Sequence, residues 1–253
     1  MMRYFLHLAY NGTPFHGWQI QPHDVSVQST IEDALRRLTG TYIPVTGAGR
    51  TDAGVNARHM VAHLDLPDSV TPDERWMRSL GAMVGRNIAL KGIEPVAPDA
   101  HARFDATSRT YRYFVHTSPD PFTGGFSWQA PPKFDFDAMN HAASLILGTR
   151  DFTSFSKLHT DVKTNICTVT AAGWHLNDAP LAPVDGSSRY FEITADRFLR
   201  NMVRAIVGTL ADIGRGKMAP ESILAILEAK DRCAAGTSMP ASPLFLWDVT
   251  YGG

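Results

Sequence analysis

The chain has 253 residues, of which 44% are hydrophobic, and its formal net charge is −1 at pH 7. That apolar share is enough for a sizeable core and excludes an intrinsically disordered chain. A net charge this close to zero gives no support to nucleic-acid binding, so any such function must rest on local clusters of arginine.

Cysteine usage and hydropathy predict the compartment. Cys167 and Cys233 are too few for a disulfide framework and lack metal-ligand spacing, which fits a reducing compartment. Residues 1–10 contain no long apolar run and predict a strand, not a signal peptide. No stretch approaches the ~18 consecutive apolar residues of a membrane span. We therefore expect a cytoplasmic protein that has no contact with a membrane.

The hydrophobic pattern of the first half alternates between the periods of strands and helices. In chain order it predicts a strand over residues 3–10, a helix over 27–39 that ends at Gly40, strands over 42–46 and around 60–66, a helix that has Thr71 as its cap and Pro72 as its first residue, and a strand over 88–96. The start at Thr71 is expected because Pro72 suits the first helical position and Glu74 completes a capping box.

The second half begins with a strand over residues 109–117, in which Tyr111, Tyr113 and Val115 share one face. A loop over 118–133 follows, rich in proline, glycine and aromatic residues. The later elements are expected to be a helix around 139–147, strands near 169–175 and 189–195, helices over 198–213 and 220–228, and a strand over 244–251.

This order of elements predicts the fold class. Strand pairs between helices favour an α+β fold with a mixed, largely antiparallel sheet and helices on one face. The loop before residue 133 suggests two halves, which we place at 1–105 and 106–253. From the order of elements alone, each half is expected to be a ferredoxin-like or RNA-recognition-like (RRM-like) unit.

The densest chemical signal is the glycine-rich loop Gly47–Val55. It fails the dinucleotide pattern, which needs a third glycine where Asp52 stands, and the P-loop pattern, which needs lysine where Val55 stands. What remains is an aspartate among small neighbours, with Arg50 two positions before it. Such a carboxylate can act as a nucleophile or a general base. The alternative is a structural Asx-turn, in which Asp52 only bonds its own backbone.

Five stretches, in order, resemble the tRNA pseudouridine synthases of the TruA type. The loop resembles the signature that carries the family's catalytic aspartate. The other four are Phe15-His16-Gly17-Trp18-Gln19 with Gln21, His101–Ala106 followed by Tyr111-Arg112-Tyr113, Phe198-Leu199 with Met202-Val203-Arg204, and Pro240-Ala241 through Leu244 with Asp248-Val249. Together they span nearly the whole chain. A single motif would be weak evidence for the family, whereas five in the right order are strong evidence.

The resemblance implies the pseudouridine synthase fold and a role for each matching residue. Asp52 would attack the target nucleoside, Tyr111 would pack against the uracil ring, and Arg204 would pair with Asp52. Leu244 would form an apolar wall of the pocket, and Arg50 would support the flipped-out nucleotide. Neither a metal nor an organic cofactor is expected, because the reaction only moves a glycosidic bond from N1 to C5.

Two of these residues have a structural alternative. Tyr111 lies on an alternating strand, where a plain core tyrosine is common. Arg204 lies four residues after Arg200 on the expected helix, a spacing typical of a solvated basic face. Trp18 is expected to pack in the core rather than to stack on a base.

Another group suggests a metal site: His63 and Asp65 share one face of a strand, with His59 further back on the same strand. Such a row is more typical of polar side chains on the outer face of a strand, so no metal site is predicted.

Arginine and lysine cluster locally in spite of the neutral total. One group is Arg103, Arg109 and Arg112, and the other is Arg197, Arg200 and Arg204, with Arg215 and Lys217 beyond. If they line one cleft, these side chains can bind an RNA backbone. Arg103 is expected to be among the substrate contacts.

Three positions depart from the family pattern. Asn56 and Asn201 stand where histidine is common, and Pro243 replaces a glycine before Leu244. Proline fixes φ and removes an N–H, so the backbone there must differ. The departures leave Asp52 and the two other catalytic candidates in place.

The resemblance implies an isomerase that converts uridine to pseudouridine in the anticodon arm of tRNA, at positions 38 to 40, and that works as a homodimer. One alternative is a catalytically silent RNA-binding protein or tRNA chaperone on the same scaffold. The set of Asp52, Tyr111 and Arg204 argues against it, because binding alone needs no such carboxylate. A carboxylate-based hydrolase would need a second acid, and no spacing supplies one.

Overall fold

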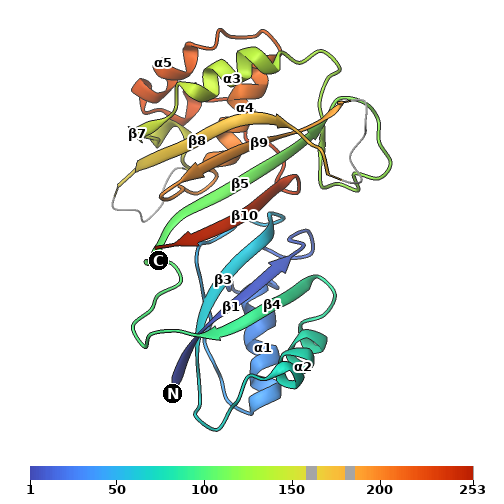
Figure 1. Cartoon of the computed structure of the whole chain (residues 1–253). Coiled ribbons are helices and arrows are strands. Elements are labelled where there is room, and N and C mark those ends of the chain that lie inside the picture. The colour runs from blue at the N-terminus through green and yellow to red at the C-terminus, as the bar shows by residue number, and fades with distance from the viewer. Residues whose placement is uncertain (158–163, 180–185, 253) are drawn as a thin grey trace. The chain divides into compact units, whose positions relative to one another are not determined.

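The computed structural model describes residues 1–157, 164–179 and 186–252. They form two compact units (Figure 1). Unit 1 comprises Met1–Thr107 together with Phe245–Gly253, and unit 2 comprises Ser108–Leu244. The last strand of the chain thus belongs mostly to the unit that contains the first strand. Within the described ranges, no helix is long and apolar enough to cross a membrane.

Unit 1 is built on a sheet whose strands lie in the order β4-β1-β3-β10, with β2 beside β3. Strand β1 is antiparallel to both β3 and β4, and β10 runs parallel to β3. The strands are β1 (Met2–Tyr10), β2 (Thr46–Gly47), β3 (Asn56–Leu66), β4 (Ile88–Pro95) and β10 (Leu244–Tyr251), and the helices are α1 (Val27–Thr39) and α2 (Glu74–Val84). Strands β1 to β4 with the two helices have the β-α-β-β-α-β order of a ferredoxin-like unit.

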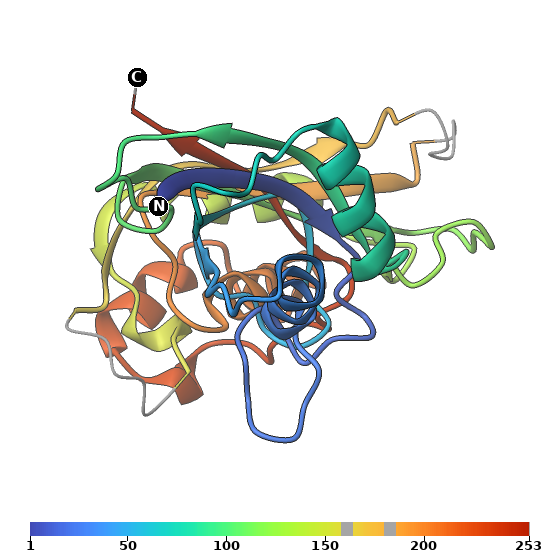
Figure 2. The ribbon, with the colours of Figure 1, turned by 90° about the horizontal axis from the view of Figure 1, so that it is seen from below.

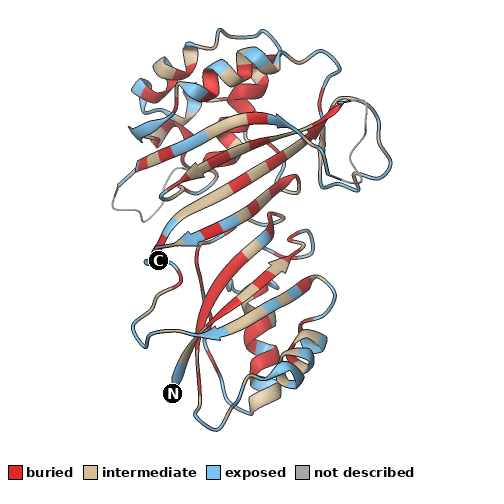
Figure 3. Ribbon diagram, in the orientation of Figure 1, coloured by how far each residue is buried: buried red, intermediate tan, exposed pale blue. Residues whose placement is uncertain are grey.

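Helix α1 has the bounds that the sequence predicts, because both of its ends are marked. Ser26 caps the N-terminus by accepting from the Ser29 N–H, and the Ser29 hydroxyl accepts from the Ser26 N–H in return. Gly40 ends the helix in the left-handed region, with φ of 74°. Figure 2 shows α1 against one face of the unit 1 strands, and Figure 3 shows buried residues along α1 and β3.

The strand predicted over residues 42–46 is wrong for all but its last residue. The Val45 N–H donates to Glu32 Oε1 at 2.9 Å, and the Val45 carbonyl accepts from Gln28 Nε2 at 3.0 Å. Side chains of α1 therefore take the place of a neighbouring strand. Glu32 is only 3% exposed and also accepts from the Tyr42 hydroxyl at 2.8 Å. The Val45 N–H and the Tyr42 hydroxyl thus each give the buried carboxylate a donor.

The predicted start of the second helix is also wrong. Helix α2 begins at Glu74, and its cap is Asp73, whose Oδ1 accepts from the Trp76 N–H at 2.8 Å. Aspartate and threonine are both good caps. Asp73 is the cap here because its carboxylate accepts from an N–H of the first helical turn. Thr71 and Pro72 lie before the helix.

Unit 2 has a sheet in the order β5-β9-β8-β7, with β6 parallel to β5. The β5–β9, β9–β8 and β8–β7 pairs are antiparallel. The strands are β5 (Ala106–His116), β6 (Trp128–Gln129), β7 (Gly148–Asp151), β8 (Ile166–Leu176) and β9 (Ser188–Ala195). The helices are α3 (Phe136–Ser144), α4 (Met202–Gly214) and α5 (Ser222–Ala229), with the short 3-10 helices η1 (Thr153–Phe155) and η2 (Arg232–Ala234).

The predicted fold class is confirmed: the chain is α+β, with largely antiparallel strand pairing and, in the part that the structure describes, five α-helices. Helix α4 is the most deeply buried of them (Figure 3), with eleven of its thirteen residues inside. It starts at Met202 and not at residue 198, because Asn201 takes a left-handed φ of 67° that interrupts the helix.

The outer face of the unit 1 sheet carries a buried histidine that cannot easily take up a proton. His63 is 9% exposed, and its Nδ1 accepts from the Ala102 N–H at 3.1 Å. Its ring also meets that of His101, with the ring centroids 4.5 Å apart. Burial, with the neighbouring His101 second, lowers the pKa of His63 to about 4.

Because of the lowered pKa of His63, we predict that the protein loses stability in mild acid. An unfolded chain protonates histidine near pH 6.5, whereas folded His63 does so only near pH 4, so the unfolded state binds the proton first. The free energy of unfolding should therefore fall as the pH drops from about 6.5 towards about 4. His63→Asn keeps an acceptor for the Ala102 N–H but cannot titrate, so it should lose less stability over this window. Denaturant unfolding at about pH 7.5 and about pH 4.5 measures both proteins, and equal losses would contradict the prediction.

Candidate active site

Asp52 lies in the loop that joins β2 to β3 in unit 1, and it is partly buried. The loop ends in a tight turn, which the Val55 N–H closes by donating to the Asp52 carbonyl at 3.1 Å. Gly54 occupies the third position of this turn with φ of 80°, which a side chain would disfavour. Gly54 is thus needed for the backbone path of the loop that carries Asp52.

The N-terminal motif packs its main chain directly on this loop. The Trp18 N–H donates to the Thr51 carbonyl at 3.2 Å, and the Gly54 N–H donates to the Phe15 carbonyl at 3.3 Å. Gly17 has φ of +86°, and a Cβ there would lie 2.5 Å from the Thr51 carbonyl oxygen. Two motifs that are about thirty residues apart in the sequence therefore form one structure around Asp52.

Buried side chains add two further contacts to the same structure. Asn56 is completely buried, and its Oδ1 accepts from the Gly12 N–H at 2.8 Å. A side chain on Gly12 would collide with the Val55 carbonyl. The hydroxyls of Tyr10 and Thr51 form a buried hydrogen bond of 2.8 Å. The first departure from the family pattern, Asn56, therefore has a structural role as an acceptor for the N-terminal segment.

Trp18 is a packing residue, as predicted. It is 2% exposed, and its indole ring lies so close to Gly47 that a Cβ on that glycine would stand 2.5 Å from a ring atom. The first glycine of the loop is therefore required by the tryptophan.

The two substrate-contact candidates of unit 1 are exposed. Arg50 lies on the Asp52 loop itself, and Arg103 lies in the segment between β4 and β5. The Arg103 guanidinium carbon stands 5.8 Å from the centroid of the Phe104 ring, which is 74% exposed. That ring also packs on His101, with centroids 4.2 Å apart. An exposed aromatic ring beside an arginine is a pair that can stack on a base and contact a phosphate.

Tyr111 lies on β5 in unit 2, on the same buried face as Tyr113 and Val115, as the alternation predicts. It is 9% exposed, whereas Tyr113 is fully buried. The Tyr111 ring meets Phe198 edge to face, with centroids 4.9 Å apart. Tyr111 therefore lies at the margin of the core, with Phe198 of the neighbouring motif against its ring.

Arg204 lies on the first turn of α4, and it is tied to a distant segment. Its Nε donates to the Met239 carbonyl at 2.6 Å, while its own carbonyl accepts from the Met239 N–H at 3.1 Å. Arg200 is exposed and precedes the helix, so the two arginines do not share a solvated helix face. Sequence analysis missed Met239, and no signal could have found it, because it acts through its main chain.

Leu244, the residue predicted to form an apolar wall of the pocket, lies at the start of β10 and is 4% exposed. The preceding residue, Pro243, is buried, and its carbonyl accepts from the Phe114 N–H at 3.1 Å. Proline keeps this acceptor, so the third departure is compatible with the main-chain contact that places Leu244.

The three residues that suggested a metal site have other partners. His63 accepts from Ala102 as described, Asp65 forms an ion pair of 2.8 Å with Arg3, and His59 Nδ1 lies 2.7 Å from Asp248. Among the described residues, no group of three or more histidine, cysteine or acidic side chains is placed to hold a metal ion.

The arginine clusters are partly neutralised by acidic side chains. Arg112 forms a 2.6 Å ion pair with Glu192 and lies over the Tyr190 ring. Arg215 and Lys217 both pair with Asp212, at 3.1 and 3.0 Å. These three cations contribute less positive potential than their number suggests.

Comparison with known proteins finds relatives along nearly the whole chain. A family model described as tRNA pseudouridine synthase matches residues 142–252. A protein of Parabacteroides distasonis named tRNA pseudouridine synthase A is 51% identical over 251 residues, which cover 99% of this chain and 96% of the relative. Proteins of the same name from Porphyromonas gingivalis and Bacillus subtilis are 50% and 40% identical, and the matches cover 99% of this chain and 98% and 99% of those relatives.

The Asn56 contact generates a prediction about the loop. Asn56→Ala removes a buried acceptor and should lower the free energy of unfolding by about 1–3 kcal/mol, because the Gly12 N–H is left unpaired. Asn11→Ala is the matched control, since Asn11 Oδ1 accepts from the Thr13 N–H in an exposed position. That control should stay within about 0.5 kcal/mol of the parent chain. Denaturant unfolding measures both variants, and similar losses would show that the buried contact is not special.

Proposed function

Since this chain belongs to the tRNA pseudouridine synthase A family, we propose that Asp52 is the nucleophile with which it converts uridine to pseudouridine in the anticodon arm of tRNA. Family membership makes the chain an isomerase that acts on tRNA. The nucleophile, the target positions and the absence of a cofactor are the finer parts of the proposal.

The reaction balances without an oxidant or a reductant. The bond from the ribose C1′ to N1 of uracil breaks, and a bond from C1′ to C5 forms. The hydrogen on C5 leaves as a proton, and N1 takes up a proton. A carboxylate that forms a temporary covalent bond can divide this exchange into two easier steps, and nothing in it requires a metal or an organic cofactor.

The observation that best supports the proposal is the way in which the Asp52 loop is held. Main-chain hydrogen bonds from the Phe15–Trp18 segment, together with glycines that permit close approach, restrict the loop on one side. A nucleophile benefits from such support, because a reacting atom must be placed within a few tenths of an ångström of its target. A solvent-exposed Asx-turn would need no such restraint.

The other roles follow the family resemblance. Tyr111 is proposed as the platform for the uracil ring and Arg204 as the cation that supports the nucleophile. Arg50 and Arg103 are proposed as contacts to the RNA, and Leu244 as an apolar wall. A uridine within a stem must leave its stack before a side chain can reach it, and exposed cations help to hold the distorted backbone. Positions 38 to 40 as targets, a homodimer and a cytoplasmic location belong to the same proposal.

Release of tritium from C5 of labelled uridine in tRNA tests the reaction, because only bond formation at C5 expels that hydrogen. Asp52→Asn keeps the size of the side chain but removes its charge, so it should abolish release while tRNA binding is largely retained. Asp68→Asn is the control, because its carboxylate is 82% exposed and pairs with the N-terminal ammonium. Release by Asp52→Asn at a rate near that of the parent chain would overturn the assignment. Binding without release by the parent chain would favour a silent RNA-binding protein.

Salt dependence tests the proposed RNA contacts. Arginine contacts to phosphate release counterions, so the logarithm of tRNA affinity should fall with the logarithm of salt concentration. Arg103→Ala should flatten that slope by about 0.7–0.9, the loss of one phosphate contact. Arg78→Ala, whose side chain is 72% exposed on α2 and pairs with Glu74, should leave the slope unchanged. Filter binding over a salt series measures all three proteins, and an unchanged slope for Arg103→Ala would remove this residue from the RNA contacts.

A further inference from the structure

One segment of unit 2, Ala235–Met239, crosses the first half of α4 in close main-chain contact; we call it the strap. The Gly236 N–H donates to the buried Thr209 hydroxyl at 2.8 Å. A Cβ on Gly236 would lie 2.7 Å from the Thr209 nitrogen, and a side chain on Gly208 would collide with the Thr237 carbonyl. The glycines on both sides allow a contact that side chains would prevent.

The end of the strap holds Arg204 at two points. As described above, Met239 donates its N–H to the Arg204 carbonyl and accepts from Arg204 Nε. Because the Nε–H lies in the plane of the guanidinium, the 2.6 Å bond to the Met239 carbonyl sets the orientation of the whole planar group. A displacement of Met239 would therefore turn the part of Arg204 that faces away from the strap.

A second arginine holds the strap from the other side. Arg232 lies in η2, and its Nη1 donates to the carbonyls of Ala235 and Gly236, at 3.4 and 3.1 Å. Its Nη2 donates to the Ser238 hydroxyl at 2.8 Å. The same hydroxyl accepts from Asn201 Nδ2 at 2.6 Å, so the residue before α4 is joined to the strap as well. The second departure from the family pattern, Asn201, therefore has a place in this arrangement.

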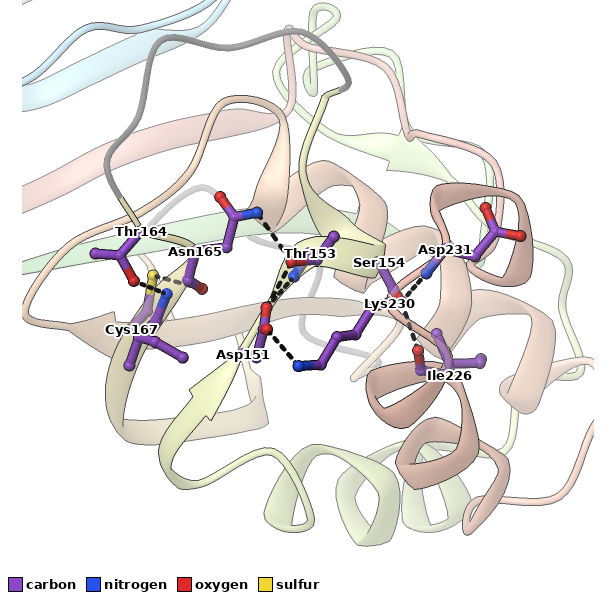
Figure 4. Close-up of polar contacts among 10 residues, drawn as sticks. Asp151, Thr153, Ser154, Thr164, Asn165, Cys167, Ile226, Lys230 and Asp231 are labelled. Carbon is purple, nitrogen blue, oxygen red and sulfur yellow. Dashed lines mark hydrogen bonds and ion pairs between the residues drawn. The ribbon is translucent and has the colours of Figure 1, made fainter.

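The two residues before Arg232 contact β7 and η1, and η1 in turn contacts α5; Figure 4 shows these contacts. The Asp231 N–H donates to the Ser154 hydroxyl at 2.9 Å, and that hydroxyl donates to the Ile226 carbonyl at 2.5 Å. Lys230 forms an ion pair of 3.0 Å with Asp151. The pKa of Asp151 lies below its usual range, first because of the hydrogen bond from the Thr153 hydroxyl and then because of Lys230. The main chain just before Arg232 is thus held by the contacts of Asp231 and Lys230.

We propose that Arg232 is a positioning residue that acts through the strap on Arg204. This inference rests on the proposed role of Arg204 in the reaction. Arg232 uses its planar fork to bind two carbonyls and one hydroxyl at once, which the single ammonium of lysine cannot reproduce. It needs no contact with the RNA, and its effect should appear in turnover and not in the affinity for tRNA.

The test compares single and double variants in the C5-tritium assay, each first shown to be folded by circular dichroism and thermal unfolding. Arg232→Ala should lower kcat by about tenfold to a hundredfold, as a misplacement of about 1 Å can, with KM nearly unchanged. Arg232→Lys should recover part of the loss. Ser238→Ala removes only the shared hydroxyl and should lower kcat in the same direction by a smaller factor. It replaces Arg232→Ala as the test variant if Arg232→Ala does not fold.

Two comparisons separate positioning from simple destabilisation. Trp174→Leu shrinks a buried ring on β8 that packs on Phe136 and Phe191 and plays no part in holding Arg232 or the strap, so it should lower the unfolding temperature but leave kcat unchanged. In an Arg204→Ala background, Arg232→Ala should cause no further loss, because the residue through which it acts is gone.

The outcomes distinguish failure of the positioning role of Arg232 from failure of the proposed role of Arg204. A large but measurable loss of kcat in Arg204→Ala, together with a fully active Arg232→Ala, would overturn the positioning role and leave the proposed function intact. Equal losses of kcat for Arg232→Ala in the presence and absence of Arg204 would overturn it as well. Arg204→Ala with the kcat of the parent chain would refute the proposed role of Arg204 and, with it, the inference.

Discussion

The close main-chain packing of residues 12–18 on the Asp52 loop is the constraint on which the rest of the account depends. The Thr51 carbonyl accepts from the Trp18 N–H, and glycine at position 17 is required because any side chain would meet that carbonyl. These contacts involve backbone atoms, so they restrict the path of the loop far more than side-chain packing alone. A carboxylate on such a loop has a defined place, which is what a nucleophile needs.

Unit 2 uses the same physical device for Arg204. The strap approaches α4 through paired glycines, and the Met239 carbonyl then binds the guanidinium. In each unit, a side chain with a proposed role in the reaction is supported by a segment from a distant part of the sequence, and glycine provides the room.

Local signals predict several regular elements well, although those at Thr71 misplace the start of α2. The bounds of α1 follow from Ser26 and Gly40, and the buried face of β5 follows from strict alternation. The prediction fails where a distant partner decides the local structure. Glu32 replaces a strand partner for the Val45 N–H, and the left-handed Asn201 delays the start of α4. The candidate site residues could be named from the motif resemblance, whereas Met239, Arg232 and the contact of Asn56 could not. Met239 acts through its main chain, and Arg232 and Asn56 bind main-chain atoms of other segments, which no side-chain pattern marks.

The most direct test of this account compares the turnover of Gly17→Ala and Gly92→Ala in the C5-tritium assay. Gly17 has a positive φ and no room for a Cβ, whereas nothing lies within 4 Å of a Cβ at Gly92 on β4 of the same unit. If the packed segment places the nucleophile, Gly17→Ala should lose at least about tenfold in kcat. Gly92→Ala should turn over at the rate of the parent chain. A folded Gly17→Ala protein that turns over as fast as Gly92→Ala would contradict the claim that this contact places Asp52.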